Sequence, residues 1–200
     1  MKKLMLFIAV LILSISAAQA QDIRLGIKGG VNFATFSGDE IENMESITGF
    51  HIGILVEVLL TERFAIQPEI FYSIQGSKYE DSSLGHFVKS EIKLNYIQVP
   101  IMTKFYIIEG FAVEVGPQLA ILTSSKAKYD VIINDTAFSY DKDLSDISSI
   151  EVSLLAGLSY RLPINVFFGA RYNYGLTNLD VNPYQNIKNN VIQLSVGYSF

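Results

Sequence analysis

The chain ends with Val191-Ile-Gln-Leu-Ser-Val-Gly-Tyr-Ser-Phe200, in which apolar and polar residues alternate up to a terminal aromatic residue. In an extended strand, successive side chains point to opposite faces, so this alternation separates an apolar face from a polar face. The apolar face consists of Ile192, Leu194, Val196, Tyr198 and Phe200. An apolar face of this length requires an apolar medium or core against it, and the period of two favours a β-strand over a helix.

The same alternation recurs in eight segments along the chain. They lie at residues 23–33, 49–60, 64–75, 92–105, 111–121, 150–160, 166–175 and 191–200. The fourth segment changes phase: Ile92, Leu94 and Tyr96 share one parity, whereas the apolar residues from Ile97 onward share the other. One extra residue in a strand produces such a change, so the sequence predicts a β-bulge near Tyr96-Ile97, with Pro100 on the inward face just beyond it.

The connections between these segments alternate in length. Short connections lie at residues 61–63, 108–110 and 161–164, and long ones at 37–47, 77–89, 124–149 and 178–190. Outer-membrane barrels show this asymmetry, and a closed barrel satisfies all backbone hydrogen bonds in lipid. The sequence therefore predicts an all-β fold: an eight-stranded antiparallel up-and-down transmembrane β-barrel with short periplasmic turns and long external loops.

Aromatic residues gather near both ends of the predicted strands, as expected of the two membrane interfaces. The group near the short turns is Phe64, Phe105, Phe111, Tyr160, Tyr198 and Phe200. The group near the long loops is Phe33, Phe50, Tyr72, Tyr96 and Tyr174.

The N-terminus and the composition agree with export. Lys2 and Lys3 precede an apolar run that ends in Ala18-Gln-Ala20, so residues 1–20 are predicted to be a cleaved signal peptide and residues 21–200 the barrel domain. The chain has 20 acidic and 15 basic residues and no cysteine. An acidic chain without a basic patch argues against nucleic-acid binding, and the lack of cysteine excludes disulfides and thiolate metal sites.

Several blocks of sequence carry a family resemblance. They are Gly26-Ile-Lys-Gly-Gly-Val-Asn32, Gly49-Phe-His-Ile-Gly53, Gln67-Pro-Glu-Ile-Phe-Tyr-Ser-Ile-Gln-Gly76, Tyr96-Ile-Gln-Val-Pro-Ile-Met-Thr-Lys104, Ala156-Gly-Leu-Ser-Tyr160, Arg171-Tyr-Asn-Tyr-Gly-Leu-Thr-Asn178 and Gly197-Tyr-Ser-Phe200. In order and spacing the chain resembles the small outer-membrane β-barrels of Bacteroidetes-type bacteria, which include PorT-like proteins. The resemblance implies location in the bacterial outer membrane, contact with its lipid, and a C-terminal signal, Tyr198 and Phe200, read by the barrel-assembly machinery. One branch of the family is associated with protein secretion.

Charged residues of inward parity are the first candidate site. They are Arg24, Lys28, Glu57, Glu69, Lys104, Glu114, Glu151 and Arg171. Eight strands leave an interior just wide enough for side chains, and buried charges must pair. We expect a structural charge network that makes the barrel rigid, with glycines on the inward face giving room to long side chains. The alternative is a gated polar channel.

The external loops are the second candidate site. The apolar stretches on either side of Asn134-Asp135 predict a hairpin that projects beyond the membrane. The residues expected to contact a partner are Tyr129, Ile132, Ile133, Phe138 and Tyr140. Acidic loop residues, Asp39 and Asp141 among them, match no dedicated calcium loop, so no metal or other cofactor is expected.

Catalysis finds little support in the sequence. A nucleophile needs an adjacent base, usually histidine, and the chain has only His51, expected to face the lumen near the outer rim, and His86, near Ser82 and Ser83 in a long loop. We therefore expect a non-enzymatic barrel that presents external loops for an envelope or secretion-related interaction. A narrow porin for small solutes is the alternative, and a soluble lipocalin-like carrier would require the apolar faces to point inward.

Overall fold

The computed structural model describes residues 23–38, 44–81, 87–133, 136–144, 147–179 and 186–200, and these form β-strands and their connections. The strands are β1 (Ile23–Gly38), β2 (Met44–Leu59), β3 (Phe64–Asp81), β4 (Phe87–Ile108), β5 (Phe111–Ile133), β6 (Thr136–Asp143), β7 (Ile150–Arg161), β8 (Val166–Gly175) and β9 (Ile187–Ser199). Within these ranges no helix is long and apolar enough to cross a membrane.

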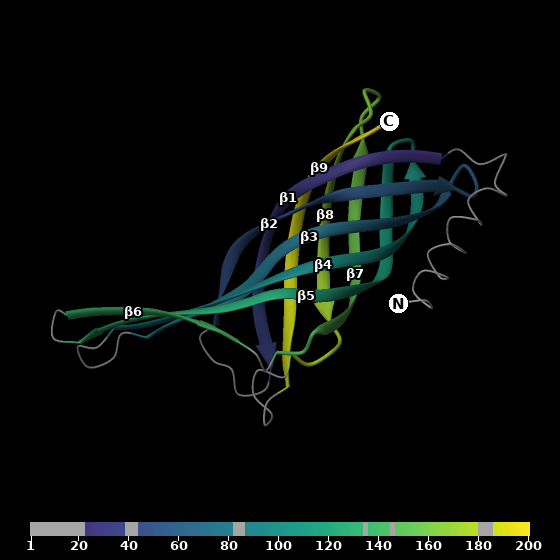
Figure 1. Ribbon diagram of the computed structural model, residues 1–200. Helices are drawn as coiled ribbons and strands as arrows, with labels where there is room; N and C mark the ends of the chain where they lie inside the picture. The colour runs from purple at the N-terminus through teal and green to yellow at the C-terminus, as the bar shows by residue number, and fades with distance from the viewer. Residues whose placement is uncertain (1–22, 39–43, 82–86, 134–135, 145–146, 180–185) are drawn as a thin grey trace.

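Eight of these strands close into a ring. Each is antiparallel to its neighbours in the order β4-β3-β2-β1-β9-β8-β7-β5, and pairing between β4 and β5 completes the circle (Figure 1). The first and last strands meet, with Ile27 opposite Tyr198. The predicted eight-stranded up-and-down barrel is thus confirmed, because closure gives every strand of the ring a partner on both sides.

The apolar faces point out of the barrel, as predicted. Ile52 is 61% exposed and Leu194 46%, whereas their polar neighbours His51 and Gln193 are buried. Other outward residues include Leu25, Ile27, Ile54, Ile70, Val115, Leu119, Leu154, Leu158 and Val196. Exposure of so many apolar side chains is favourable in hydrocarbon and unfavourable in water, so the outer surface of the barrel is suited to contact with lipid.

The outward aromatic residues follow the predicted two bands with one exception. Phe64, Tyr160 and Phe200 are exposed near the short turns, and Phe50 and Tyr174 near the other end. The exception, Tyr96, is fully buried in the lumen.

The bulge predicted near Tyr96-Ile97 does occur at this level of the sheet, but it lies on the neighbouring strand and not in the fourth segment itself. Strand β4 keeps one parity throughout, so that Leu94, Tyr96, Gln98 and Pro100 all face inward. The change in the sequence pattern reflects a change in the lining of the lumen from polar to apolar. The register does shift at this level, but the extra residue is Thr123 on the neighbouring strand β5, between the pairs Asn95–Ser124 and Tyr96–Leu122.

Several strands are longer than predicted and continue beyond the ring. Where the sequence suggested loops at 77–89 and 124–149, β3 runs to Asp81, β4 begins at Phe87, and β5 continues to Ile133 and pairs with β6. We call this projecting sheet the blade; it consists of residues 44–46, 77–81, 87–93, 126–133 and 136–143. Figure 1 shows it extending to the left, away from the end of the barrel that holds the short turns. Hydrogen bonding between the paired strands satisfies the backbone N–H and C=O groups between neighbouring strands of the blade.

Candidate functional site

The lower lumen, nearer the short turns, is organised around the Glu57 carboxylate of β2. Glu57 is fully buried and accepts hydrogen bonds from Arg24 Nη1 at 3.1 Å, Lys104 Nζ at 2.9 Å and Arg161 Nη2 at 2.8 Å. The Tyr106 hydroxyl donates a fourth, at 2.9 Å. A carboxylate in the lumen is stable only with such partners, because isolated charge is strongly disfavoured away from water.

A second carboxylate, Glu69 of β3, organises the middle of the lumen. The guanidinium of Arg171 donates to both of its oxygens, at 2.6 and 2.7 Å, and Lys28 Nζ lies 3.2 Å away. Arg171 Nε also donates to Glu114 of β5. Such a bidentate contact orients the guanidinium relative to the carboxylate in addition to neutralising its charge. On the neighbouring strand, a Cβ on Gly157 would lie 2.4 Å from the Ala170 carbonyl oxygen and 2.7 Å from Arg171 Cγ, so glycine leaves room for the paired backbone and for the aliphatic part of Arg171.

Gln67 joins these two groups into one network. It accepts a hydrogen bond from Lys104 Nζ at 3.2 Å and donates to Glu69. We call the whole network the ion cluster. Its charged members are Arg24, Lys28, Glu57, Glu69, Lys104, Glu114, Arg161 and Arg171. They come from β1 to β5, β7 and β8, so the cluster ties together strands on opposite sides of the barrel.

Arg161 and Tyr106 are members of this network that the sequence analysis missed. Arg161 was assigned to a short turn, but it is the last residue of β7 and has the same parity as the inward residues Glu151 and Ser159. Extending the strand by one residue would have found it.

Glu151 has inward parity, as predicted, but it stands apart from the ion cluster. Its Oε2 accepts a hydrogen bond from Asn189 Nδ2 at 3.3 Å, and the same amide donates to Gln75 Oε1 at 2.6 Å. Within the part of the chain that the structure describes, no cationic side chain lies within ion-pair distance of it. The structure therefore brings together seven of the eight predicted lumen charges and leaves this one among amides.

An apolar layer fills the lumen at the end near the long connections. Its buried members are Phe36, Leu94, Tyr96, Ala120, Ile147, Leu179 and Ile187. Together with the ion cluster, it places two side-chain layers of opposite character in one narrow interior.

His51 lies in the lumen between two hydrogen-bonding partners. Its Nδ1 is 2.7 Å from Asn32 Oδ1 and its Nε2 is 3.3 Å from Ser195 Oγ. The order Ser–His–Asn matches a nucleophile, a base and an orienting group, but His51 is only 2% exposed. His86, Ser82 and Ser83 lie outside the described residues. Among the described residues, no three histidine, aspartate or glutamate side chains are grouped so as to hold a metal ion.

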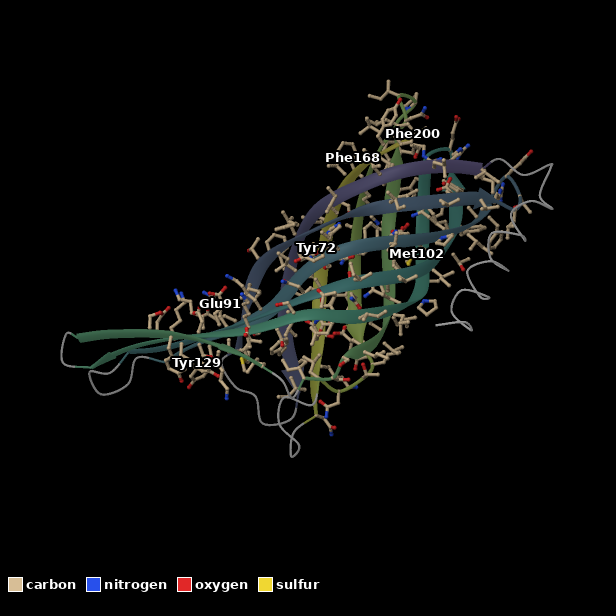
Figure 2. All side chains as sticks on the ribbon, in the orientation of Figure 1. Tyr72, Glu91, Met102, Tyr129, Phe168 and Phe200 are labelled. Carbon is tan, nitrogen blue, oxygen red and sulfur yellow. The ribbon has the colours of Figure 1, made fainter. Side chains whose placement is uncertain are left out.

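The blade carries the external residues singled out by the sequence. Tyr129 of β5 and Tyr140 of β6 are opposite each other, and their rings stack at 4.9 Å with an interplanar angle of 18°. Figure 2 shows Tyr129 and Glu91 on the blade, far from Phe168 and Phe200. The backbones of Ile132, Ile133 and Phe138 pair within the β5–β6 hairpin; their side chains are outside the described part of the structure.

Charges of alternating sign cross one face of the blade. Glu45, Lys78, Glu91, Lys128 and Asp141 are successive register partners on β2, β3, β4, β5 and β6. Directly opposite residues share a face of a sheet, and opposite charges at such positions attract. The Lys78–Glu45 ion pair is 2.9 Å long. We call this row the charge ladder.

The same face carries further charges beside the ladder. Lys93 Nζ lies 2.9 Å from Glu91 Oε1, and Lys128 Nζ lies 3.5 Å from Asp130 Oδ2. A hydrogen bond from the Ser139 hydroxyl is the main cause that lowers the pKa of the Asp130 carboxyl below its usual value.

The C-terminal residues lie at the end of the barrel opposite the blade. Phe200 is 70% exposed, and its backbone N–H donates to the Leu25 carbonyl at 2.7 Å. Its ring meets that of Tyr198 edge-on, with centroids 5.4 Å apart. Both rings are thus outside the lumen and near the short turns.

Comparison with known proteins agrees with this architecture. The family model described as "Outer membrane protein beta-barrel domain" matches residues 18–181. Neisserial surface protein A is a solved structure with 17% identity and a TM-score of 0.54, over 88% of this chain and 97% of that one. The attachment invasion locus protein Ail of Yersinia pestis has 18% identity and a TM-score of 0.50, over 88% and 98%. At these identities the likeness shows the fold alone. No curated protein matches the sequence.

Proposed function

The chain belongs to the outer membrane protein β-barrel domain family and lies in the bacterial outer membrane, and we propose that it acts there without catalysis, by presenting its blade to another protein of the cell envelope. The observation that carries this proposal is the blade itself. Strands β3, β4 and β5 continue well beyond the ring, and β6 is added outside it (Figure 1). A barrel needs only its ring to span lipid, so this ordered sheet serves a purpose outside the membrane.

The lumen supports this proposal over a porin. The ion cluster connects seven strands of the ring across the interior, and the apolar layer lies between it and the long connections. Eight strands enclose little more than their own side chains. Passage of a solute would require separating buried ion pairs, which is strongly unfavourable. We infer that the ion cluster keeps the barrel rigid and closed.

The buried position of His51 supports a non-enzymatic role. Its partner Ser195 also faces the lumen and is 8% exposed, so a substrate would have to enter the interior to meet the hydroxyl. Hydrogen bonding of this histidine to Asn32 satisfies a polar group inside the barrel.

Three finer features of the proposal are supported by the sequence. The blocks described above favour a PorT-like relationship and, with it, a secretion-related partner. The terminal Tyr198 and Phe200 fit a signal for the barrel-assembly machinery, and residues 1–20 fit a cleaved signal peptide.

Site-specific photocrosslinking in intact cells tests the proposed role of the blade. A photoreactive amino acid at Tyr140 should give a crosslink to a distinct envelope protein, because this exposed ring lies on the blade. The same group at Glu62, in a short turn at the opposite end, is the matched control. If Tyr140 gave no crosslinked partner, or only the pattern seen from Glu62, the proposed function would be wrong.

A further inference from the structure

Strand β6 forms the edge of the blade. It pairs with β5 from Lys126–Asp143 to Ile133–Thr136, and it is the last strand in the sheet order. Among the residues that the structure describes, no strand pairs with its other side. The backbone N–H and C=O groups on that side can therefore bind a further strand, as in β-strand addition.

The charge ladder ends at this edge on an acid. Along the row, each charge faces one of opposite sign, and Asp141 of β6 is the terminal member. Asp143 lies two residues further along the same face and follows two cations, Lys93 and Lys126, in its own row. Both aspartates are exposed. Continuing the alternation of the charge ladder by one strand would place a cation opposite Asp141, and a cation opposite the exposed Asp143 would likewise be attracted to it.

We propose that the free edge of β6 binds an extended segment of a partner protein that carries lysine or arginine at two positions two residues apart. The segment adds antiparallel or parallel to β6, its backbone hydrogen-bonds to the edge, and its two cations lie opposite Asp141 and Asp143. This inference rests on the proposed function and specifies the chemistry of the partner.

A second copy of the chain fits this edge less well. Antiparallel pairing of β6 with itself around Lys142 would put Asp141 of each copy opposite Asp143 of the other. Like charges at directly opposite positions destabilise a sheet. In this register the two aspartates therefore oppose pairing of β6 with itself, whereas they attract a basic strand.

A peptide titration tests the inference with the full-length protein in lipid nanodiscs. The probe is a fluorescent peptide in which lysine alternates with valine and threonine, and binding is followed by fluorescence anisotropy. Asp141→Lys combined with Asp143→Lys should weaken binding by about tenfold or more, because two attractive cross-strand pairs become repulsive. Lys142→Ala, on the opposite face of the same strand, is the matched control and should leave binding unchanged.

A second peptide separates strand addition from simple charge attraction. Methylation of alternate backbone nitrogens keeps every lysine but removes the hydrogen-bond donors that face β6. This peptide should lose binding altogether. Equal binding of the methylated and unmethylated peptides would overturn the inference, as would equal binding of the wild-type protein and the double variant, or dimerisation of the chain that the lysine peptide does not prevent.

The crosslinking experiment distinguishes failure of the inference about the β6 edge from failure of the proposed function of the blade. If Tyr140 crosslinks a partner equally well in the wild-type protein and in the double variant, the blade is a contact surface but the β6 edge is not the site. If no partner crosslinks at Tyr140 in either protein, the proposed function itself is wrong.

Discussion

The ion cluster joins strands across the lumen and the blade's charge ladder joins neighbouring strands, both through opposite charges, but the two differ in burial. The carboxylates of Glu57 and Glu69 are completely buried, whereas the side chains of Glu45 and Lys128 on the charge ladder are 57% and 52% exposed. Breaking a buried pair leaves a charge without water, but breaking an exposed pair does not. The lumen charges are therefore enclosed by the fold, whereas charges of the blade are paired with one another but remain partly exposed to water.

The largest effect is expected from removing the central cation of the lumen. Arg171→Met leaves both Glu69 and Glu114 without their guanidinium and should lower the free energy of unfolding by about 3–5 kcal/mol. Urea titration of the protein in lipid vesicles measures this. Arg63→Met, in an exposed turn, is the control and should change stability by less than about 0.5 kcal/mol. Similar losses in the free energy of unfolding for the two variants would contradict the distinction between buried and exposed charges.

The apolar layer should be nearly as sensitive. Leu94 is fully buried in it, so Leu94→Ala should cost about 2–5 kcal/mol through lost burial and the cavity left behind. The same urea titration applies. A cost below about 0.5 kcal/mol, the range of an ordinary surface substitution, would show that Leu94 is not packed as described.

Glu151 and Glu57 allow two buried carboxylates of the lumen to be compared, one bound by an amide and one by cations. Because its contact is an amide and not a cation, Glu151→Gln leaves no buried charge unpaired, and we expect a change below about 1 kcal/mol. Glu57→Gln, the same chemical change at a carboxylate with three cationic partners, should cost about 3 kcal/mol or more. Equal losses would mean that Glu151 also serves as a counter-charge.

The smallest effect is expected on the blade. Lys128→Ala removes one member of the charge ladder, and exposed pairs contribute roughly 0–1 kcal/mol. Stability of the barrel in urea should hardly change. A loss comparable to that of Arg171→Met would show that the blade is part of the barrel's stability and not a separable external sheet.

The regular parts of this fold follow from period-two alternation, which is why the ring and the outward position of Ile52 and Leu194 were predictable. The pattern fails where the lumen itself becomes apolar: Leu94 and Tyr96 point inward, yet their residue types resemble those of the lipid face. Parity also places side chains on a face without showing which ones meet across the barrel. The partners of Glu57, for example, come from strands far apart in sequence. The length of the blade was not predictable either, because strand pairing there continues outside the membrane, where lipid no longer requires apolar and polar residues to alternate.

The most direct test of the account is single-channel recording of the wild-type protein in planar lipid bilayers. With the ion cluster and the apolar layer in place, we expect no steady conductance across a range of voltages, because the interior is filled by paired charges and packed side chains. A reproducible, steady ionic conductance from the folded wild-type barrel would contradict this account and favour a porin.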